Sequence, residues 1–365
     1  MSAMKHNWTK EEILDIYNKP LMELLYEAAT IHREHHDPNT VQVSTLLSIK
    51  TGGCPEDCGY CPQAARYHTD IEGNDLMSVQ QVKAQALRAK ASGSSRVCMG
   101  AAWRNVKDGS EFDQVLEMVR TINKLDMEVC CTLGMITENQ AKRLAEAGLY
   151  AYNHNLDSSE EHYKKVISTR GFKDRLDTID NVRKTNVTVC SGGIIGMGEK
   201  IEDRAGMLVA LSTLNPQPES VPINALVAVK GTPLEDQEPI SIWDMVRMVA
   251  TTRIVMPETQ VRLSAGRTEM TREGQALCFF AGANSIFAGD KLLTTPNPDV
   301  NEDMKMFELL GLTPQKPFIK KMKPETVEAQ DSQYQPLGEK PKWTRPGHTI
   351  ERNEQAKERA KSVKP

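Results

Sequence analysis

Three cysteines lie close together in the segment GGCPEDCGYCPQ, residues 52–63. They are Cys54, Cys58 and Cys61, and their spacing is C-x3-C-x2-C. A zinc site usually closes its shell with two separated pairs of ligands, and no second pair follows at a suitable distance. Three thiolates leave one metal position open, and a four-iron cluster bound in this way has one iron free to take a small molecule. The segment therefore predicts an open iron–sulfur site, with a zinc loop or unrelated surface cysteines as the alternatives.

Composition narrows the class of protein. The chain has 365 residues, 39% of them hydrophobic and 26% charged, and its formal net charge is −4. Without a basic excess, nucleic acid is not an expected partner. No apolar run approaches the roughly 20 residues that span a bilayer, and the N-terminus has no signal-peptide core, so we expect a cytoplasmic protein without a membrane segment. In that reducing compartment the eight cysteines should be metal ligands, catalytic groups or buried side chains rather than disulfides.

Short apolar segments alternate with helical ones through most of the chain. The eight expected strands are VSTLLSIK, RVCMGAA, EVCCTLG, AYNHNLD, TVCSGGIIG, SVPINALVAV, VRLSAG and SIFAGD. The helices expected after them span 78–93, 111–126, 137–148, 158–186, 200–214, 241–257, 271–284 and 299–310. Eight such units predict an α/β protein with a (β/α)8 TIM-type barrel, whose active site lies at the carboxyl ends of the strands. A doubly wound sheet is the alternative, but the first turn lacks a glycine-rich dinucleotide motif.

Two segments flank the predicted barrel, for which we expect residues 41–315. Residues 1–40 should form an N-terminal helical segment, with a capping box that begins at Thr9 and a break or new helix start at Pro20. Residues 316–365 contain more lysine and arginine than aspartate and glutamate, several prolines and few apolar residues. That composition predicts a basic, largely disordered tail.

Side chains of a strand alternate between the barrel interior and the surrounding helices. If the apolar residues of the second, third, fifth and seventh strands face the helices, the residues between them face inward. These inward residues include Cys98, Cys130, Cys190 and Arg262. Barrel interiors are normally filled by valine, isoleucine and leucine, so this polar cluster predicts a second site, with buried inert cysteines as the alternative. Cys131 should face the helices, and Cys278, on a predicted helix, should lie in the core.

Polar residues also occupy the fourth and sixth predicted strands. Alternation places Asn153, Asn155 and Asp157 inside the barrel and turns His154 toward the helices. Asn224 faces inward by the same rule. An asparagine amide can donate and accept hydrogen bonds together, which would suit a ligand with both functions. Ordinary turn chemistry at a strand end is the alternative.

The cysteine motif resembles that of the radical S-adenosylmethionine enzymes. Tyr60, before the third cysteine, and GGIIGMGE (192–199) are similar to the aromatic residue and the strand end that contact adenine in that family. Longer segments resemble the biotin synthase family within it: SIKTGGCPEDCGYCPQAARY, CMGAAW, YAYNHNLDSS, VCSGGIIGMGE, ESVPINALVAVKGTPL and VRLSAGR. The resemblance covers about residues 40 to 315, and no motif there departs from the family's pattern.

This resemblance implies an enzyme that inserts sulfur into dethiobiotin to form biotin, with no side chain needed as a catalytic base. It assigns a 4Fe-4S cluster, whose open iron binds S-adenosylmethionine for cleavage to a 5'-deoxyadenosyl radical, to Cys54, Cys58 and Cys61. It assigns a 2Fe-2S cluster, as the sulfur source, to Cys98, Cys130, Cys190 and Arg262. The implied S-adenosylmethionine contacts are Tyr60, Asn155, Asp157, Arg175 and Ile194. The implied contacts to the ureido ring of dethiobiotin are Asn153, Asn155 and Asn224.

The resemblance further implies an electron donor of the flavodoxin or ferredoxin type, iron–sulfur assembly machinery as a partner, and a homodimer. Two alternatives stay open from the residues themselves. One is another radical S-adenosylmethionine enzyme in which the inward cysteines are inert, and the other is a noncatalytic metal-binding or electron-carrier protein. Lipoyl synthase, another sulfur inserter, would carry a second cysteine motif before the first, and no cysteine precedes Cys54.

Overall fold

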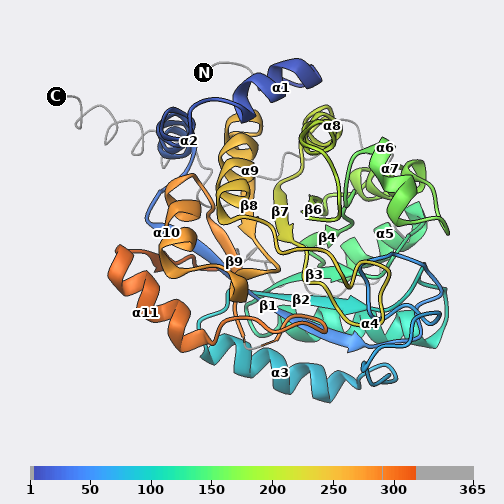
Figure 1. Ribbon diagram of the computed structural model, residues 1–365. Coiled ribbons are helices and arrows are strands. Elements are labelled where there is room, and N and C mark those ends of the chain that lie inside the picture. Colours follow the sequence, from blue (N-terminus) through green and yellow to red (C-terminus); the bar gives the residue numbers. More distant parts are fainter. Residues whose placement is uncertain (1–3, 290, 318–365) are drawn as a thin grey trace.

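A closed ring of parallel strands forms the centre of the molecule (Figure 1). The computed structural model describes residues 4–289 and 291–317. The ring contains, in order, β1 (Thr40–Lys50), β2 (Arg96–Ala101), β3 (Glu128–Thr132), β4 (Ala151–Asn153), β5 (Thr188–Cys190), β7 (Ser220–Ala225), β8 (Gln260–Leu263) and β9 (Ser285–Phe287). β9 pairs with β1 and closes the ring. The predicted TIM-type (β/α)8 barrel is therefore confirmed.

Two short strands lie beside this ring. β6 (Gly193–Ile195) pairs with β7, and β10 (Thr313–Pro314) pairs with the first residues of β1. The sequence segment expected as the fifth strand is thus divided between β5 and β6. The division brings the glycine-rich segment after β5 to the carboxyl end of the ring.

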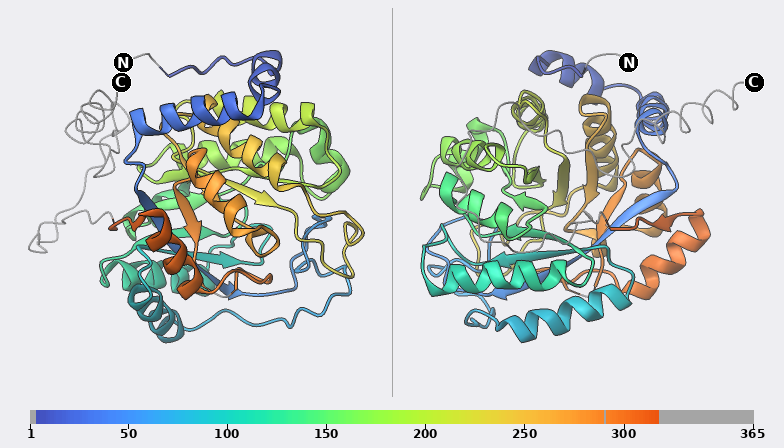
Figure 2. Two further views of the ribbon diagram at one scale, coloured as in Figure 1. Left: turned by 60° about the vertical axis from the view of Figure 1, so that its left-hand side comes forward. Right: turned by 180° about the vertical axis from the view of Figure 1, so that it is seen from behind.

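Helices surround the ring on its outer side, as the two views of Figure 2 show. They are α3 (Val79–Ala91), α4 (Ser110–Asn123), α5 (Glu138–Glu146), α6 (Glu160–Val166), α7 (Phe172–Arg183), α8 (Ile201–Ser212), α9 (Ile242–Val255), α10 (Arg272–Phe280) and α11 (Val300–Leu310). The single helix expected over 158–186 is wrong, because α6 and α7 are separate. Between them, the N–H groups of Ser168 and Thr169 donate to the carboxylate of Asp57 instead of continuing the helical ladder.

The N-terminal helical segment has the predicted form. Thr9 caps α1 (Lys10–Tyr17) in a reciprocal capping box with Glu12, and α2 (Leu21–His35) starts directly after Pro20. These helices pack against α8 and α9, outside the ring (Figure 1). Most of the predicted tail, residues 318–365, lies outside the described residues.

Buried apolar side chains form two clusters that follow the predicted alternation. The larger cluster, between the ring and the helices, contains Val97, Met99 and Cys131 from the strands and also Cys278. The smaller cluster, inside the ring, contains Cys98 and Cys130. Cys98, Cys130 and Cys131 therefore lie on the predicted sides of their strands, and Cys278, on α10, lies in the core as predicted. Among the described residues, no helix is long and apolar enough to cross a membrane.

Candidate active site

A cavity of about 320 Å³ opens among the carboxyl ends of the ring strands and the loops that follow them. Both groups of cysteines contribute to its wall. The predicted site residues that line it are Cys54, Cys58, Tyr60, Cys61, Cys98, Cys130, Asn153, Asn155, Asp157, Arg175, Ile194, Asn224 and Arg262. Cys190 is fully buried beside the wall, with its Sγ 3.3 Å from Nδ2 of Asn153 and 3.9 Å from Nη1 of Arg262. The barrel thus brings the predicted site residues to one place.

The loop after β1 carries the three clustered cysteines and is closed by its own backbone. Gly52 and Gly53, with φ of 74° and 71°, turn the chain out of the strand in a conformation that favours glycine. The N–H of Cys54 then donates to the carbonyl of Gln63 at 3.0 Å, and the N–H of Cys61 donates to that of Cys58 at 2.9 Å. These bonds fold the loop so that its three thiols border the same cavity.

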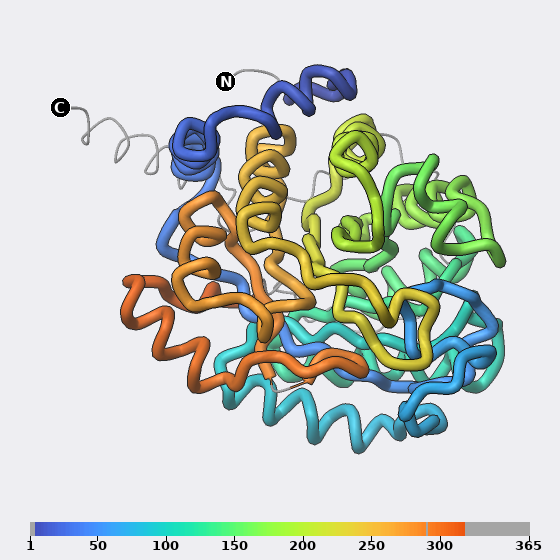
Figure 3. The backbone as a smooth tube through the Cα atoms, viewed as in Figure 1, coloured from blue at the N-terminus to red at the C-terminus, as the bar shows by residue number. Residues whose placement is uncertain are grey.

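Two distant segments hold this cysteine loop in place. Gly59 donates its N–H to the carbonyl of Val166 at 2.9 Å and accepts from the N–H of Leu234 at 3.2 Å. Figure 3 shows the loop, in blue, beside the yellow segment that follows β7. The Asp57 carboxylate also binds the backbone and hydroxyl of Ser168 and Thr169. The loop is therefore fixed by contacts far away in sequence.

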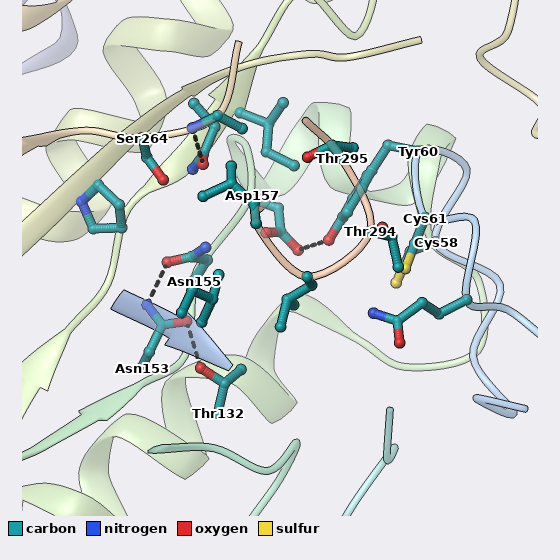
Figure 4. Close-up of a pocket in the computed structure, with 18 of the residues that line it drawn as sticks. Cys58, Tyr60, Cys61, Thr132, Asn153, Asn155, Asp157, Ser264, Thr294 and Thr295 are labelled. Atoms are coloured by element: carbon teal, nitrogen blue, oxygen red, sulfur yellow. Dashed lines mark hydrogen bonds between the residues drawn. The ribbon is translucent and has the colours of Figure 1, made fainter. Parts of the chain in front are cut away.

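Tyr60, Asp157 and Arg175 form a polar group next to the cysteine loop, in which the Asp157 and Arg175 side chains are buried. Figure 4 shows Tyr60 directed at Asp157. The hydroxyl of Tyr60 donates to Oδ2 of Asp157 at 2.9 Å, and Arg175 forms an ion pair with the same oxygen. Burial opposes the charge of Arg175, but the Asp157 carboxylate raises its pKa above the usual value. Burial likewise raises the pKa of Tyr60 well above its usual range, and the Asp157 charge adds to the effect. Arg175 is therefore charged and Tyr60 neutral near pH 7.

The glycine-rich segment after β5 packs directly on Asp157. The N–H of Ile194 donates to the Asp157 carbonyl at 2.9 Å. A Cβ at Gly193 would lie 2.6 Å from that same carbonyl oxygen and 2.1 Å from the sulfur of Met207. Only glycine allows this approach, which places the Ile194 side chain on the cavity wall.

The three predicted asparagines are oriented by hydrogen bonds to other groups of the protein. Thr132 donates to Oδ1 of Asn153, whose Nδ2 donates to Oδ1 of Asn155, each at 3.1 Å (Figure 4). On the other side, Asn224 donates to the carbonyl of Gly193 at 2.9 Å. Each asparagine also borders the cavity, so its amide can be shared between the protein and a ligand.

The alternation predicted for residues 153–157 is wrong beyond Asn153, where β4 ends. His154, expected to face the helices, borders the cavity as well. Asp157 reaches the site through a left-handed turn, with φ of 67°, and not through strand geometry. The predicted position of Asp157 at the cavity agrees with the structure, but the strand alternation from which it was predicted does not extend to this residue.

Inside the ring, Cys98 and Cys130 lie opposite each other on adjacent strands. Burial would raise the pKa of the Cys98 thiol, but its hydrogen bond with Cys130 and the charges of Arg262 and Arg96 lower it to about 7. The pKa of Cys130 is raised by the same hydrogen bond and by burial. One thiol of this pair is therefore readily ionised beside two guanidinium groups.

Comparison with known proteins identifies the family. Biotin synthase of Flavobacterium psychrophilum is 86% identical over 97% of this chain and 98% of the relative. That of Christiangramia forsetii is 84% identical over 99% of both chains, and that of Nostoc punctiforme is 58% identical over 86% of this chain and 94% of the relative. The chain belongs to the biotin synthase family. Family membership implies S-adenosylmethionine and iron–sulfur clusters as cofactors.

Two family models match within the barrel of this biotin synthase family member. The Radical SAM superfamily model matches residues 48–211, and the Biotin and Thiamin Synthesis associated domain matches residues 222–313. The crystal structure of methylornithine synthase (PylB) superposes with a TM-score of 0.72 over 84% of this chain and 94% of that one, at 19% identity. This last likeness concerns the fold alone.

The chemistry of the loop thiols fits an iron–sulfur group in this biotin synthase family member. Burial raises the pKa of Cys58 to about 11, and burial together with the neighbouring thiol raises that of Cys61 to about 12. Such thiols ionise near neutral pH only when a cation binds, as iron would. No three cysteine, histidine or acidic side chains in residues 4–289 and 291–317 are arranged around a single ion. Thiolates that share a multi-iron cluster lie farther apart than those bound to one ion.

Some residues on the cavity wall were not predicted. Glu56 is buried and lies 3.5 Å from Arg104 and 3.7 Å from Arg170, which also borders the cavity. The segment 292–295 adds two leucines and two threonines to the wall. A signal for Glu56 was its place inside the cysteine motif. Arg104 and Arg170 could not be found in this way, because each meets Glu56 from a distant part of the chain.

Proposed function

We propose that this protein converts dethiobiotin to biotin by radical insertion of sulfur, as the names of its relatives indicate. The carbons that receive the sulfur are unactivated, so neither an acid nor a base can prepare them and a cofactor-derived radical is required. The observation that carries the proposal is the convergence of two cysteine groups on one cavity. One group can hold the radical-forming cluster and the other the sulfur source.

Cys54, Cys58 and Cys61 would hold a 4Fe-4S cluster. When bound, this cluster supplies the electron that cleaves S-adenosylmethionine to a 5'-deoxyadenosyl radical. The loop itself supplies position, because Asp57 and Gly59 tie it to the end of α6, to the turn after α6 and to the segment after β7. A loop fixed in this way keeps the distance between the bound cofactor and the substrate constant.

S-adenosylmethionine would lie against Tyr60, Asn155, Asp157, Arg175 and Ile194. The Arg175 guanidinium is charged and suits the carboxylate of the methionine part, whereas the Asp157 carboxylate can accept from ribose hydroxyls. Tyr60 and Ile194 supply apolar surface for the adenine ring. The two charged residues are paired with each other, which limits the cost of their burial.

Dethiobiotin would be held by Asn153, Asn155 and Asn224 at its ureido ring. A cyclic urea offers one carbonyl acceptor and two N–H donors, and amide side chains match both. Leu292 and Leu293 supply apolar wall for the alkyl chain and exclude water from the site. Exclusion of water protects a carbon radical from side reactions.

Cys98, Cys130, Cys190 and Arg262 would hold a 2Fe-2S cluster inside the ring. When bound, this cluster supplies a bridging sulfide to the substrate. The donor set supports the assignment, since three cysteines are buried in the ring and Nη1 of Arg262 points to the sulfur of one of them, Cys190. Arg262 has no role as an acid here and would restrain the cluster.

Several partners follow from the same proposal. The first cluster needs an electron donor, for which we propose a flavodoxin or ferredoxin, and both clusters need iron–sulfur assembly machinery. We also propose a cytoplasmic homodimer, by analogy with the family. Size measurement in solution and fractionation of cells test these two properties directly.

The proposed reaction can be tested in one anaerobic experiment. Reconstituted protein, reductant, S-adenosylmethionine and dethiobiotin are mixed for a single turnover, and 5'-deoxyadenosine and biotin are measured together by mass spectrometry. We expect both products. 5'-Deoxyadenosine without biotin would keep the radical site but overturn the substrate or the second cluster. Neither product, with no binding of S-adenosylmethionine by calorimetry, would favour the noncatalytic alternative.

A further inference from the structure

A buried chain of polar side chains runs from Arg262 across the amino-terminal half of the barrel interior. Nη2 of Arg262 donates to Oε1 of Gln42 at 2.9 Å, and Nε2 of Gln42 donates to Oε2 of Glu128 at 3.3 Å. Glu128 in turn accepts from Nε of Arg96 at 2.7 Å. None of these four side chains is more than 2% exposed. They link β8, β1, β3 and β2 in one network.

Gln42 has a defined orientation in this network. Its Oε1 accepts from both Arg262 and Ser285, at 2.9 and 3.1 Å. The reverse orientation would set its NH2 group against an arginine donor and its oxygen against the carboxylate of Glu128. The Gln42 amide therefore lies between the positive guanidinium of Arg262 and the negative carboxylate of Glu128.

This arrangement leaves Arg262 without a carboxylate partner in the described parts of the chain. Its Nε donates to the hydroxyl of Ser285 at 2.9 Å, and its guanidinium lies 4.6 Å from the centre of the Phe287 ring. Neutral partners thus fix two of its nitrogens, and the third, Nη1, is directed at Cys190. Arg96, by contrast, is held by the Glu128 carboxylate. The charge of Arg262 remains available to the sulfur atoms of the interior site.

We propose that Gln42 is a positioning residue for the interior cluster: it orients Arg262 toward Cys190 and keeps that arginine apart from Glu128. The inference rests on the proposed function, because it concerns the cluster proposed for Cys98, Cys130, Cys190 and Arg262. Partners in the shell around metal ligands typically contribute 10- to 100-fold to metal affinity or activity. Gln42 belongs to that shell and touches no ligand sulfur itself.

Gln42→Met tests the role, because methionine fills a similar volume and offers no strong acceptor for Arg262. The matched control is Gln260→Met, a buried glutamine on β8 whose Oε1 has no partner among the described residues. Both proteins are reconstituted anaerobically beside the wild type. Iron and sulfide per chain, the optical and electron-paramagnetic-resonance spectra of each cluster, and thermal unfolding of the metal-free chain are then measured.

We expect Gln42→Met to retain the interior cluster roughly 10-fold less well, or with an altered spectrum, while the loop cluster stays as in the wild type. Gln260→Met should leave both clusters unchanged. A Gln42→Met protein with the wild-type spectrum and iron content would overturn the positioning role alone. A wild-type protein that binds only the loop cluster would overturn the proposed function instead.

Ser285→Ala provides a second route if Gln42→Met does not fold. It removes another neutral partner of Arg262, and the small change keeps the chain length and volume of β9 nearly the same. We expect a weaker change of the same kind in the interior-cluster spectrum. Gln42→Asn, which keeps the amide but shortens its reach, should lie between Gln42→Met and the wild type. Identical spectra in all of these variants would exclude the role.

Discussion

The two cysteine groups of this protein are held by different means. Cys54, Cys58 and Cys61 lie on an irregular loop, which needs backbone and carboxylate contacts to two other segments to keep its shape. Cys98 and Cys130 lie on strands, where the register of the ring sets their positions. The loop group is therefore sensitive to changes at distant anchors, and the strand group is sensitive to changes of its own side chains.

The electrostatic surroundings of the two groups differ as well. Burial dominates at the loop, and the pKa of Cys58 and Cys61 rises to about 11 and about 12. Inside the ring, burial again opposes ionisation, but the hydrogen bond with Cys130 and the charges of two arginines lower the pKa of Cys98 to about 7. The thiol of Cys98 is therefore ionised at lower pH than the two buried loop thiols.

The largest expected effect separates the loop group from the rest of the protein. Cys58→Ala should reduce cleavage of S-adenosylmethionine to below detection, because the loop cluster loses one of three ligands. The measurement is 5'-deoxyadenosine after anaerobic reconstitution. Cys278→Ala, which changes a buried cysteine of the outer core, is the control and should retain cleavage. Cleavage at the normal rate in the Cys58 variant would exclude a cluster on this loop.

The next expected effect separates the two groups from each other. Cys190→Ala should still form 5'-deoxyadenosine but should form no biotin, because only the interior cluster is lost. Cys131→Ala is a close control, since Cys131 follows Cys130 in the chain and packs in the outer core. Normal biotin yield from Cys190→Ala would contradict the assignment of the sulfur source.

Sequence alone was sufficient for the parts of the site that lie on regular strands. Strand alternation has a period of two, so Cys98 and Cys130 could be placed inside the ring and Cys131 outside it. The barrel followed from the alternation of strands and helices for a similar reason. Both the sides of the strands and the barrel could thus be predicted from regular patterns in short stretches of sequence.

Irregular segments and element ends could not be predicted in this way. The cysteine loop depends on Asp57, whose partner Ser168 is 111 positions away. His154 was assigned to the wrong side because β4 ends one residue earlier. Gln42 was missed because β1 begins at Thr40, before the first residue of the apolar pattern. Each failure concerns a contact or a boundary that no short pattern records.

A third prediction tests the anchoring of the cavity wall beside the loop. Asp157→Asn keeps an acceptor for Tyr60 but leaves the buried Arg175 without its carboxylate. Breaking one side of a buried ion pair costs about 3–5 kcal/mol, so the free energy of unfolding should fall by that order. Urea unfolding of the metal-free protein measures the change.

The control for this change is Asp177→Asn on α7, which breaks the exposed pair with Lys173. Exposed pairs contribute little, so no measurable change in the unfolding free energy is expected there. Equal destabilisation by both variants would mean that the buried Asp157–Arg175 pair stabilises the fold no more than an exposed pair does. Loss of S-adenosylmethionine binding in the Asp157 variant alone would further separate the two pairs.

The smallest expected effect is a difference in thiol reactivity between the two groups. The thiolate is the nucleophile, so alkylation slows as pH falls through the pKa of each cysteine. In metal-free protein, iodoacetamide should modify Cys98 with a midpoint near pH 7, whereas the rates at Cys58 and Cys61 should still increase above pH 9. Peptide mapping by mass spectrometry gives the rate at each site.

Access to the reagent must be separated from ionisation in this experiment. All three cysteines border the same cavity, so a difference in access changes the rate at each one but not the pH of its midpoint. Arg262→Met removes one of the two charges that lower the pKa of Cys98. In this variant the alkylation midpoint of Cys98 should therefore move to higher pH, while the midpoints of Cys58 and Cys61 should not move. An unchanged Cys98 midpoint would show that the interior arginine does not control the ionisation of its neighbouring thiols.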